Sequence, residues 1–178
     1  MRSRRLLTAL CVSVAPLPWP AAAFGQEPQR PFVVASNIQI ESGDTWTQDG
    51  LKFRLYGVQS CLRGTDFVQT AQRADCGLAS IAQFAALIQS SSTSCQPLGA
   101  ANDEAVFVVC GAKVGAVTID VGTALIASGY AFAAVNKAGA PINANYLVTE
   151  LVAKNRRQGL WSGVFKHPVQ LLLNGPAQ

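Results

Sequence analysis

The chain has 178 residues, of which 49% are apolar and 13% are charged, and this balance excludes a disordered or strongly solvated protein. It is long enough for one domain with a buried core. The formal charge is +4, but three of the 14 basic residues lie in a targeting segment at the start, so eleven remain against ten acidic residues. A nearly neutral mature chain excludes general electrostatic binding of a phosphate backbone, and any nucleic-acid contact would need a local patch.

Residues 1–25 have the three parts of a secretory signal peptide. An Arg-rich start precedes an apolar stretch over residues 6–17, and the small residues Ala21–Ala23 offer a cleavage site. A membrane anchor needs about 20 unbroken apolar residues, whereas three prolines interrupt this run. Because of Ser3-Arg4-Arg5, a twin-arginine export signal remains an alternative to an ordinary secretory signal. The sequence predicts cleavage near residue 25, no stable membrane anchor in the mature protein, and a periplasmic or secreted location.

Four of the five cysteines lie outside the signal segment, and an even number in an exported chain predicts disulfides. We expect Cys61 to pair with Cys76 and Cys95 with Cys110, because each pair closes a short local loop. Such a loop contributes about 3 kcal/mol in the chain-entropy model. A zinc site is the competing interpretation, but the spacing lacks a Cys-x-x-Cys pair and the only histidine, His167, is remote in sequence.

One domain is expected over residues 31–168, and it opens with a three-strand meander. Strands are predicted over residues 32–40, 45–47 and 51–58. Asp49-Gly50 is a strong signal for the second hairpin turn. Apolar and polar residues alternate along the third strand, so one face packs on the core and the other face presents polar side chains that could bind a ligand. Residues 59–75 are predicted as a loop, and a helix follows from Leu78 to Ile88.

The second half of the domain is predicted to alternate between strands and helices. Short strands are expected over residues 95–98 and 106–110, with a turn over residues 99–104 between them. Asp120 is the expected N-cap of a short helix, Val121–Ser128, which Gly129 ends in a left-handed conformation.

A last helix is predicted from Ala144 to Gln158. Its buried stripe should consist of four apolar residues, Leu147, Val148, Leu151 and Val152. Glu150 is expected to pair with Lys154 one turn further on. We expect Trp161 to pack against the body and His167 to be exposed and inert. Residues 169–178 are predicted to form a peripheral tail.

Three separated segments have the order and spacing of one known family. They are Gly43-Asp44-Thr45 with Phe53–Val58, Asp120-Val121 with Ala124–Ala131, and Tyr146–Lys154 with Gly159-Leu160-Trp161. Together they resemble the thermonuclease family, the staphylococcal-nuclease-like domains, over nearly the whole mature chain. The resemblance implies an α+β fold that is mainly β: a five-stranded OB-fold barrel with about three helices, one of them inserted between the third and fourth strands.

The same resemblance carries an expectation about chemistry. Active members of the family use calcium to hydrolyse the phosphodiester bonds of DNA and RNA. Carboxylates hold the calcium ion, and two arginines stabilise the charged transition state. Asp44 matches the first metal carboxylate, and Arg54 matches the first phosphate-binding arginine. The next family motif, Asp-Thr-Pro-Glu, reads Gln59-Ser60-Cys61-Leu62 here, so the second carboxylate and the proposed general base are missing. Ala105 stands where the second arginine belongs, and the reactive centre is therefore incomplete.

These observations predict an exported binding or assembly module that is catalytically inactive and needs no cofactor. Its expected contact surface comprises Asp44, Trp46, Arg54, Tyr56 and Gln59. The partner is left open among an oligosaccharide, a nucleic acid and an exported protein. Three other interpretations remain: Asp44 as an ordinary turn residue, Arg54 in an ion pair with Asp44 or Glu41, and the two aromatic residues as strand fillers.

The alternative function is a weak nuclease that depends on calcium or another divalent metal. It would keep Asp44 as a metal ligand and Arg54 as a catalytic residue. Relocated carboxylates would have to replace the missing ones, and the candidates on nearby loops are Asp66, Asp103 and Glu104.

Overall fold

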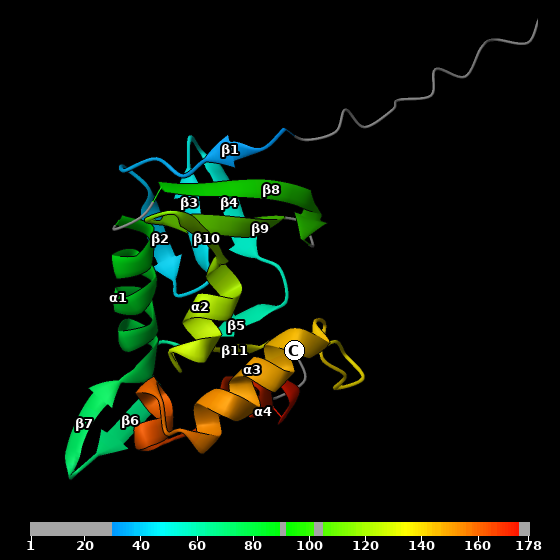
Figure 1. The fold of residues 1–178 in the computed structure, drawn as a ribbon. Helices are drawn as coiled ribbons and strands as arrows, with labels where there is room; N and C mark the ends of the chain where they lie inside the picture. The colour runs from blue at the N-terminus through cyan, green and yellow to red at the C-terminus, as the bar shows by residue number, and fades with distance from the viewer. Residues whose placement is uncertain (1–29, 90–91, 102–104, 175–178) are drawn as a thin grey trace, which may run out of the picture.

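The computed structural model of the protein describes residues 30–89, 92–101 and 105–174 (Figure 1). The predicted signal peptide, residues 1–25, lies outside the described residues. The fold of the described part is α+β with more strand than helix, which confirms the predicted class. No helix in these ranges combines the length and the apolar character that a membrane crossing requires.

The predicted meander is present as β2 (Gln39–Ser42), β3 (Thr45–Gln48) and β4 (Leu51–Leu55). Two of its strands are shorter than predicted: the strand expected over residues 32–40 is divided into β1 (Phe32–Val33) and β2, and the strand expected over residues 51–58 ends at Leu55. Asp49 and Gly50 both have positive φ, 51° and 77°, as a two-residue hairpin turn requires. The turn fixes the register of β3 on β4, and Trp46 therefore lies opposite Phe53. Both side chains are buried in the core, so this face of the hairpin points inward.

Two long strands complete the main sheet. β9 (Ala105–Val114) runs parallel to β4, β8 (Ser92–Ala101) is antiparallel to β9, and β1 (Phe32–Val33) pairs with β8. β10 (Val117–Asp120) pairs with the far end of β9. The order in the described residues is β1-β8-β9-β4-β3-β2, and no ladder there joins β2 to β1, so the sheet is not closed into a barrel.

The turn predicted over residues 99–104 falls partly on β8, whose last residue is Ala101. The other residues of that turn, 102–104, lie outside the described part of the chain. β8 is longer than predicted because its backbone pairs with β9 from Ser92 onward, beyond the apolar segment that the sequence pattern marks.

Two small sheets lie below the main one. β5 (Val58–Ser60) pairs with β11 (Ala131–Ala133). β6 (Asp66–Gln69) pairs with both β7 (Gln72–Asp75) and β12 (Val164–Phe165). The prediction of a loop over residues 59–75 is therefore wrong. β5 and β6 find partners more than 70 residues further along the chain, and local periodicity does not contain that information.

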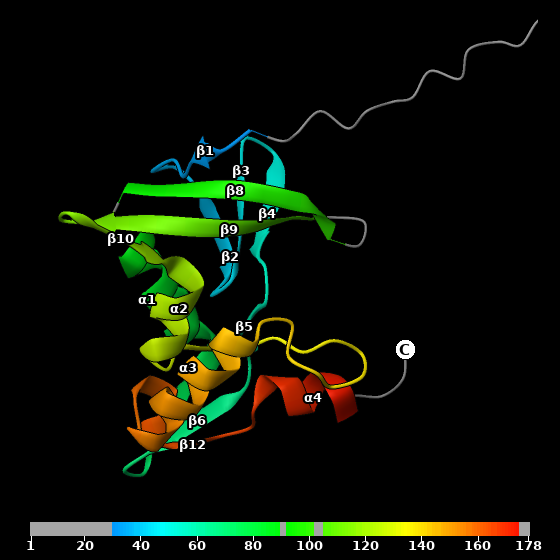
Figure 2. The same ribbon diagram turned by 45° about the vertical axis from the view of Figure 1, so that its right-hand side comes forward.

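The helices gather beside and beneath the main sheet (Figure 2). They are α1 (Cys76–Gln89), α2 (Val121–Ala127), α3 (Ala144–Asn155), the 3-10 helix η1 (Gly159–Ser162) and α4 (Pro168–Asn174). Asp120 caps α2 by accepting the Thr123 N–H, and Gly129 follows with φ of 78°, as predicted. The predicted tail begins as α4, while residues 175–178 lie outside the described ranges.

The prediction for the buried face of α3 is wrong. Leu147, Val148, Leu151 and Val152 are all exposed, whereas the buried residues of this helix are Tyr146, Glu150 and Ala153. Tyr146 donates a hydrogen bond from its hydroxyl to Asp120, and Glu150 accepts the Ala133 N–H at 2.6 Å. The face of α3 that packs is therefore the one whose side chains have hydrogen-bond partners at the end of β10 and on β11, and not the apolar face that the sequence pattern marks.

Both predicted disulfides are present. Cys61 pairs with Cys76, and Cys95 pairs with Cys110. The first bridge joins the segment after β5 to the first residue of α1 and belongs to a small core cluster with Phe132 and Leu160. The second joins residues directly opposite each other on β8 and β9, within the main core cluster.

Candidate functional site

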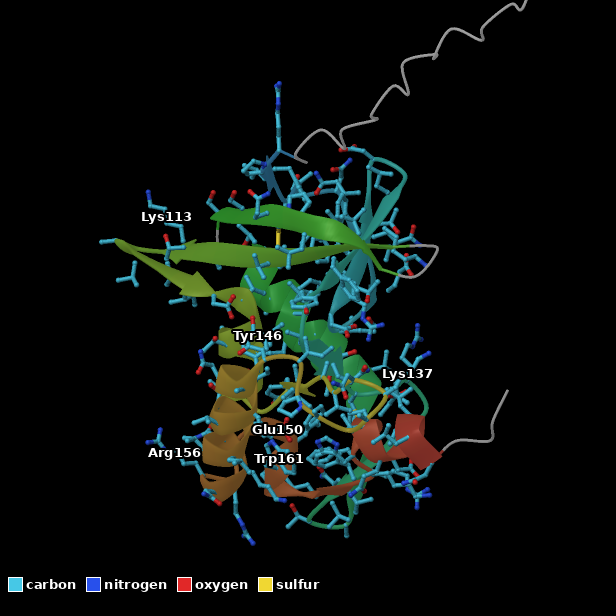
Figure 3. All side chains as sticks on the ribbon, turned by 90° about the vertical axis from the view of Figure 1, so that its right-hand side faces the viewer. Lys113, Lys137, Tyr146, Glu150, Arg156 and Trp161 are labelled. Carbon is cyan, nitrogen blue, oxygen red and sulfur yellow. A yellow bond between two sulfur atoms is a disulfide. The ribbon has the colours of Figure 1, made fainter. Side chains whose placement is uncertain are left out.

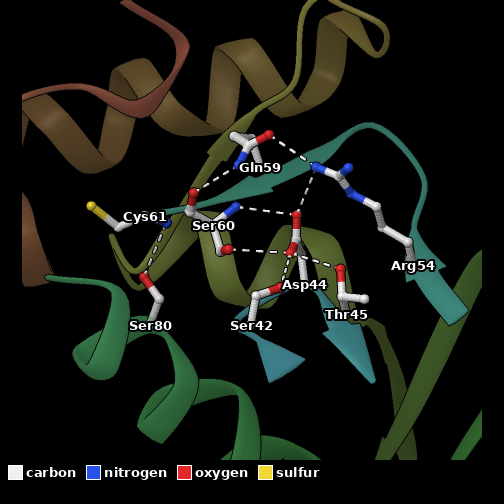
Figure 4. Close-up of polar contacts among 8 residues, drawn as sticks. All are labelled: Ser42, Asp44, Thr45, Arg54, Gln59, Ser60, Cys61 and Ser80. Carbon is white, nitrogen blue, oxygen red and sulfur yellow. Dashed lines mark hydrogen bonds and ion pairs between the residues drawn. The ribbon is translucent and has the colours of Figure 1, made fainter. Parts of the chain in front are cut away.

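Asp44 lies in the turn between β2 and β3 with only 2% of its surface exposed. Its carboxylate accepts five hydrogen bonds from the protein itself (Figure 4). Three come from the hydroxyls of Ser42, Thr45 (3.1 Å) and Ser60 (3.2 Å). The fourth comes from the Ser60 N–H at 3.3 Å, and the fifth comes from Arg54. An ionised carboxylate offers about four acceptor positions, so this one is fully used.

Close packing holds the Asp44 turn in place. A Cβ added to Gly43 would lie 2.7 Å from the Cβ of Ser80, so only glycine lets the turn approach α1 this closely. Ser80 in turn donates its hydroxyl to the carbonyl of Tyr130 at 2.6 Å and accepts the Cys61 N–H at 3.3 Å. The turn, α1 and the end of β5 therefore form one connected unit.

Arg54 extends from β4 across the top of this unit. Its Nη2 lies 3.3 Å from a carboxylate oxygen of Asp44 and 3.0 Å from the amide oxygen of Gln59. The ion pair with Asp44 is one of the two that the sequence left open. Glu41, the other, pairs with Lys52 at 2.9 Å. A hydrogen bond from Thr47 and the charge of Lys52 lower the pKa of Glu41.

Gln59, which the sequence analysis aligned with a metal carboxylate, is also internal. Only 6% of its surface is exposed, and its Nε2 donates to the carbonyl of Ser60 at 2.9 Å. Its amide thus bridges Arg54 to β5. Gln59 orients the guanidinium from within the protein and does not contribute an exposed contact.

The calcium that the resemblance implies does not fit this donor set. Calcium in proteins takes six to eight oxygen ligands from carboxylates, carbonyl groups and waters, and it needs oxygens that are free to coordinate it. Here the oxygens of Asp44 and Gln59 already accept hydrogen bonds, and the Arg54 guanidinium occupies the position beside them. Within the described ranges, no group of three or more His, Cys, Asp or Glu side chains is arranged to hold a metal ion.

The relocated carboxylates do not supply the missing ligands in the described part of the chain. Asp66 forms an ion pair with Arg73 at 3.0 Å. Both residues belong to the β6–β7 hairpin, which projects beneath α1 and away from β2 and β3 (Figure 1). The other two candidates, Asp103 and Glu104, lie outside the described residues.

Trp46 does not belong to an exposed surface, so this part of the predicted contact set is wrong. Its side chain is completely buried and packs against Phe53 and Phe84, with ring centroids 5.7 Å and 5.6 Å away. The hairpin turn at Asp49-Gly50 could have shown from the sequence that Trp46 faces the core. Counting back from it places Trp46 opposite Phe53, on the apolar face.

Tyr56 does lie at the surface, beside an aromatic residue that the sequence analysis missed. It is 39% exposed, and its ring meets Phe107 edge-on with centroids 5.4 Å apart. Phe107 lies directly opposite Arg54 in the parallel pairing of β4 and β9. The alternation of residues 106–110 could have identified Phe107 as outward-facing. We call Arg54, Tyr56 and Phe107 the open surface.

A second polar cluster was not predicted. His167 Nε2 lies 3.1 Å from Glu150 Oε1, and the imidazole is surrounded by the rings of Phe132, Phe165 and Trp161. The prediction that His167 is exposed is therefore wrong, because a partner on α3 and three aromatic rings partly bury it. Lys154, the expected partner of Glu150, instead places its ammonium over Trp161.

Comparison with known proteins adds no relative to this picture. No protein-family model matches the chain, and no curated protein sequence matches it either.

Proposed function

We propose that this protein is an exported, disulfide-stabilised binding or assembly module, built on a thermonuclease-like OB fold that does not hydrolyse phosphodiester bonds. The observation that carries the proposal is the set of five internal hydrogen bonds on Asp44. A carboxylate that accepts this many hydrogen bonds from the protein stabilises the fold and has no oxygen left to bind a metal ion. The guanidinium that would stabilise a transition state instead neutralises that carboxylate.

The strand and helix order supports the OB-fold part of the proposal. A three-strand meander and the three short strands β5, β6 and β7 precede helix α1, and β8 and β9 follow it, with the remaining helices after them. β9 returns to pair in parallel with β4, the last strand of the meander. The open edge between β1 and β2 suits a barrel that is only partly closed, which is how OB folds are described.

Export is supported by the two disulfides together with the signal-like start of the sequence. Disulfides persist in the periplasm and outside the cell, whereas cytosolic reductants keep thiols reduced. The small core cluster that contains Cys61 and Cys76 would lose its covalent link in a reducing compartment.

Binding is assigned to the open surface formed by Arg54, Tyr56 and Phe107. The side chain of Arg54 is 37% exposed although one of its nitrogens is engaged, so the remaining donors can reach a ligand. The adjacent aromatic rings suit stacking against a sugar or a base. Because the mature chain is nearly neutral, an oligosaccharide or a protein suits this surface better than a long nucleic acid.

The test is a cleavage assay on the protein without its signal peptide, with calcium and single-stranded DNA. We expect no cleavage above buffer, and the same background for Asp44→Ala and Arg54→Ala. Loss of a general base costs about 10²–10⁴ in rate, and loss of one charge-stabilising donor costs about 10²–10³. Cleavage that disappears in either variant would overturn the proposal.

A further inference from the structure

A groove of about 570 Å³ opens between α3, β12 and α4, on a side of the molecule that shares no residue with the open surface. Its size falls within the range of small-molecule sites, about 300–1,000 Å³. The walls are mostly apolar and include Val135, Leu147, Val164, Phe165 and Val169. Four polar or charged side chains also line it, namely Glu150, Lys154, His167 and Gln170.

Trp161 forms a rigid aromatic wall of this groove. Its ring meets Phe132 and Phe165 edge-on, with centroids 5.5 Å and 5.2 Å away. Figure 3 shows Trp161 close to Glu150 in the lower part of the molecule. Contacts of this kind fix the indole plane before any ligand arrives, and a pre-organised wall loses little entropy on binding.

Glu150, the acidic residue of the groove, already has hydrogen-bond partners within the protein. One oxygen of Glu150 accepts the Ala133 N–H at 2.6 Å, and the other lies 3.1 Å from the imidazole of His167. The Glu150 side chain is only 11% exposed. Its carboxylate therefore fixes β11 and His167 to α3, while the second ring nitrogen of His167 has no hydrogen-bond partner among the described residues.

The positive charge of the groove is not engaged by a carboxylate. Lys154 is exposed, and in the part of the chain that the structure describes its ammonium has no acidic partner. It lies 5.2 Å from the centroid of the Trp161 ring. A cation above an aromatic wall, in a groove that the Gln170 side chain also lines, can reach an anionic group on a molecule that packs against that wall.

We propose that this groove binds a small carboxylic acid with a flat, apolar ring. The carboxylate would meet Lys154 at the rim, and the ring would lie against Trp161 and the valine side chains. This site is separate from the function proposed for the open surface, since it depends on neither Arg54 nor Tyr56.

The test is a titration of the ¹⁵N-labelled mature protein with phenylacetate, followed by amide and indole N–H resonances. Trp161 reports on the groove, and the buried Trp46 serves as an internal reference. Phenylacetamide has nearly the same shape without the charge. A ligand of this size is expected to bind in the millimolar range. Lys154→Met removes the cation, and Lys113→Met, at the far end of β9, is the matched control (Figure 3).

We expect saturable shifts at Trp161 and in α3 and α4 with phenylacetate and weaker ones with phenylacetamide. Lys154→Met should lower the affinity for phenylacetate about threefold to fivefold, as for an exposed ion pair, and Lys113→Met should not change it. Equal binding of the acid and the amide would overturn the proposal, as would shifts confined to other regions or no saturable shift at all.

Discussion

The guanidinium of Arg54 lies 3.3 Å from the carboxylate of Asp44, and these are the two charged residues that the sequence analysis matched to a metal-dependent reactive centre. In a working metal centre Asp44 would face a cation and Arg54 would face a phosphate. Here they face each other, and Gln59 and Ser60 complete the arrangement. The charges that resemble a reactive centre therefore contribute to the stability of the fold.

Replacement of Asp44 should destabilise the protein. In Asp44→Ala the buried N–H of Ser60 and three hydroxyls lose their acceptor, and an unsatisfied buried donor costs about 1–3 kcal/mol. We expect a loss of about 2–3 kcal/mol in the free energy of unfolding, measured with urea. Asp49→Asn is the control, because this exposed turn residue has a positive φ that asparagine tolerates. Equal stability of Asp44→Ala and the control would contradict the structural role.

The two disulfides should each contribute to stability. Each closes a loop with a sequence separation of 15 residues, for which the chain-entropy model gives about 3 kcal/mol. The double variants Cys61→Ala with Cys76→Ala, and Cys95→Ala with Cys110→Ala, should unfold at lower urea concentrations than the wild type. A reductant should then lower the stability of each double variant further. Peptide mapping that links Cys61 to a residue other than Cys76 would refute the pairing.

Acid should weaken the start of α1 through Asp75. Hydrogen bonds from the N–H groups of Gly64, Leu78 and Gly77 lower the pKa of this carboxyl below its usual value. A lowered pKa contributes stability that is present above the unfolded pKa of about 3.9 and is lost as the pH falls through the folded value.

Asp75→Asn should therefore cost about 1 kcal/mol at neutral pH, because the amide removes the negative charge at the start of α1 and one acceptor oxygen, and the difference from wild type should shrink below about pH 4. Asp66→Asn, on the neighbouring strand, is the control, because its ion pair with Arg73 is exposed and contributes little. Thermal unfolding across this pH range gives the measurement. A stability difference between Asp75→Asn and wild type that grows in acid would contradict a stabilising role of the ionised Asp75 carboxylate.

The parts of the fold that the sequence predicts are those governed by local chemistry. Asp49-Gly50 determines a hairpin, Asp120 caps a helix, and short cysteine spacings pair locally, and all three predictions agree with the structure. These features depend on residues that are close in sequence, so the local sequence is enough to predict them.

The wrong predictions depend on partners distant in sequence. Glu150 is buried in α3 because the Ala133 amide and His167 satisfy its carboxylate, and those partners are not visible in a helical periodicity that favours Leu147 and Leu151. Similarly, β5 pairs with β11, more than 70 residues further along the chain, and β6 pairs with Val164 and Phe165 of β12 as well as with the adjacent β7. At the candidate site, Arg54 and Asp44 could be identified by pattern, but their partners on β5, Gln59 and Ser60, become evident only in three dimensions.

The most direct test of the central claim, that the protein's own donors fully occupy Asp44, is a calcium titration of the ¹⁵N-labelled mature protein. A site with a millimolar dissociation constant would add about 1.4 kcal/mol of stability at about 10 mM calcium. We predict no saturable shift at Asp44, Thr45 or Ser60 and no such stabilisation. Saturable shifts at these residues that disappear in Asp44→Ala would contradict the claim.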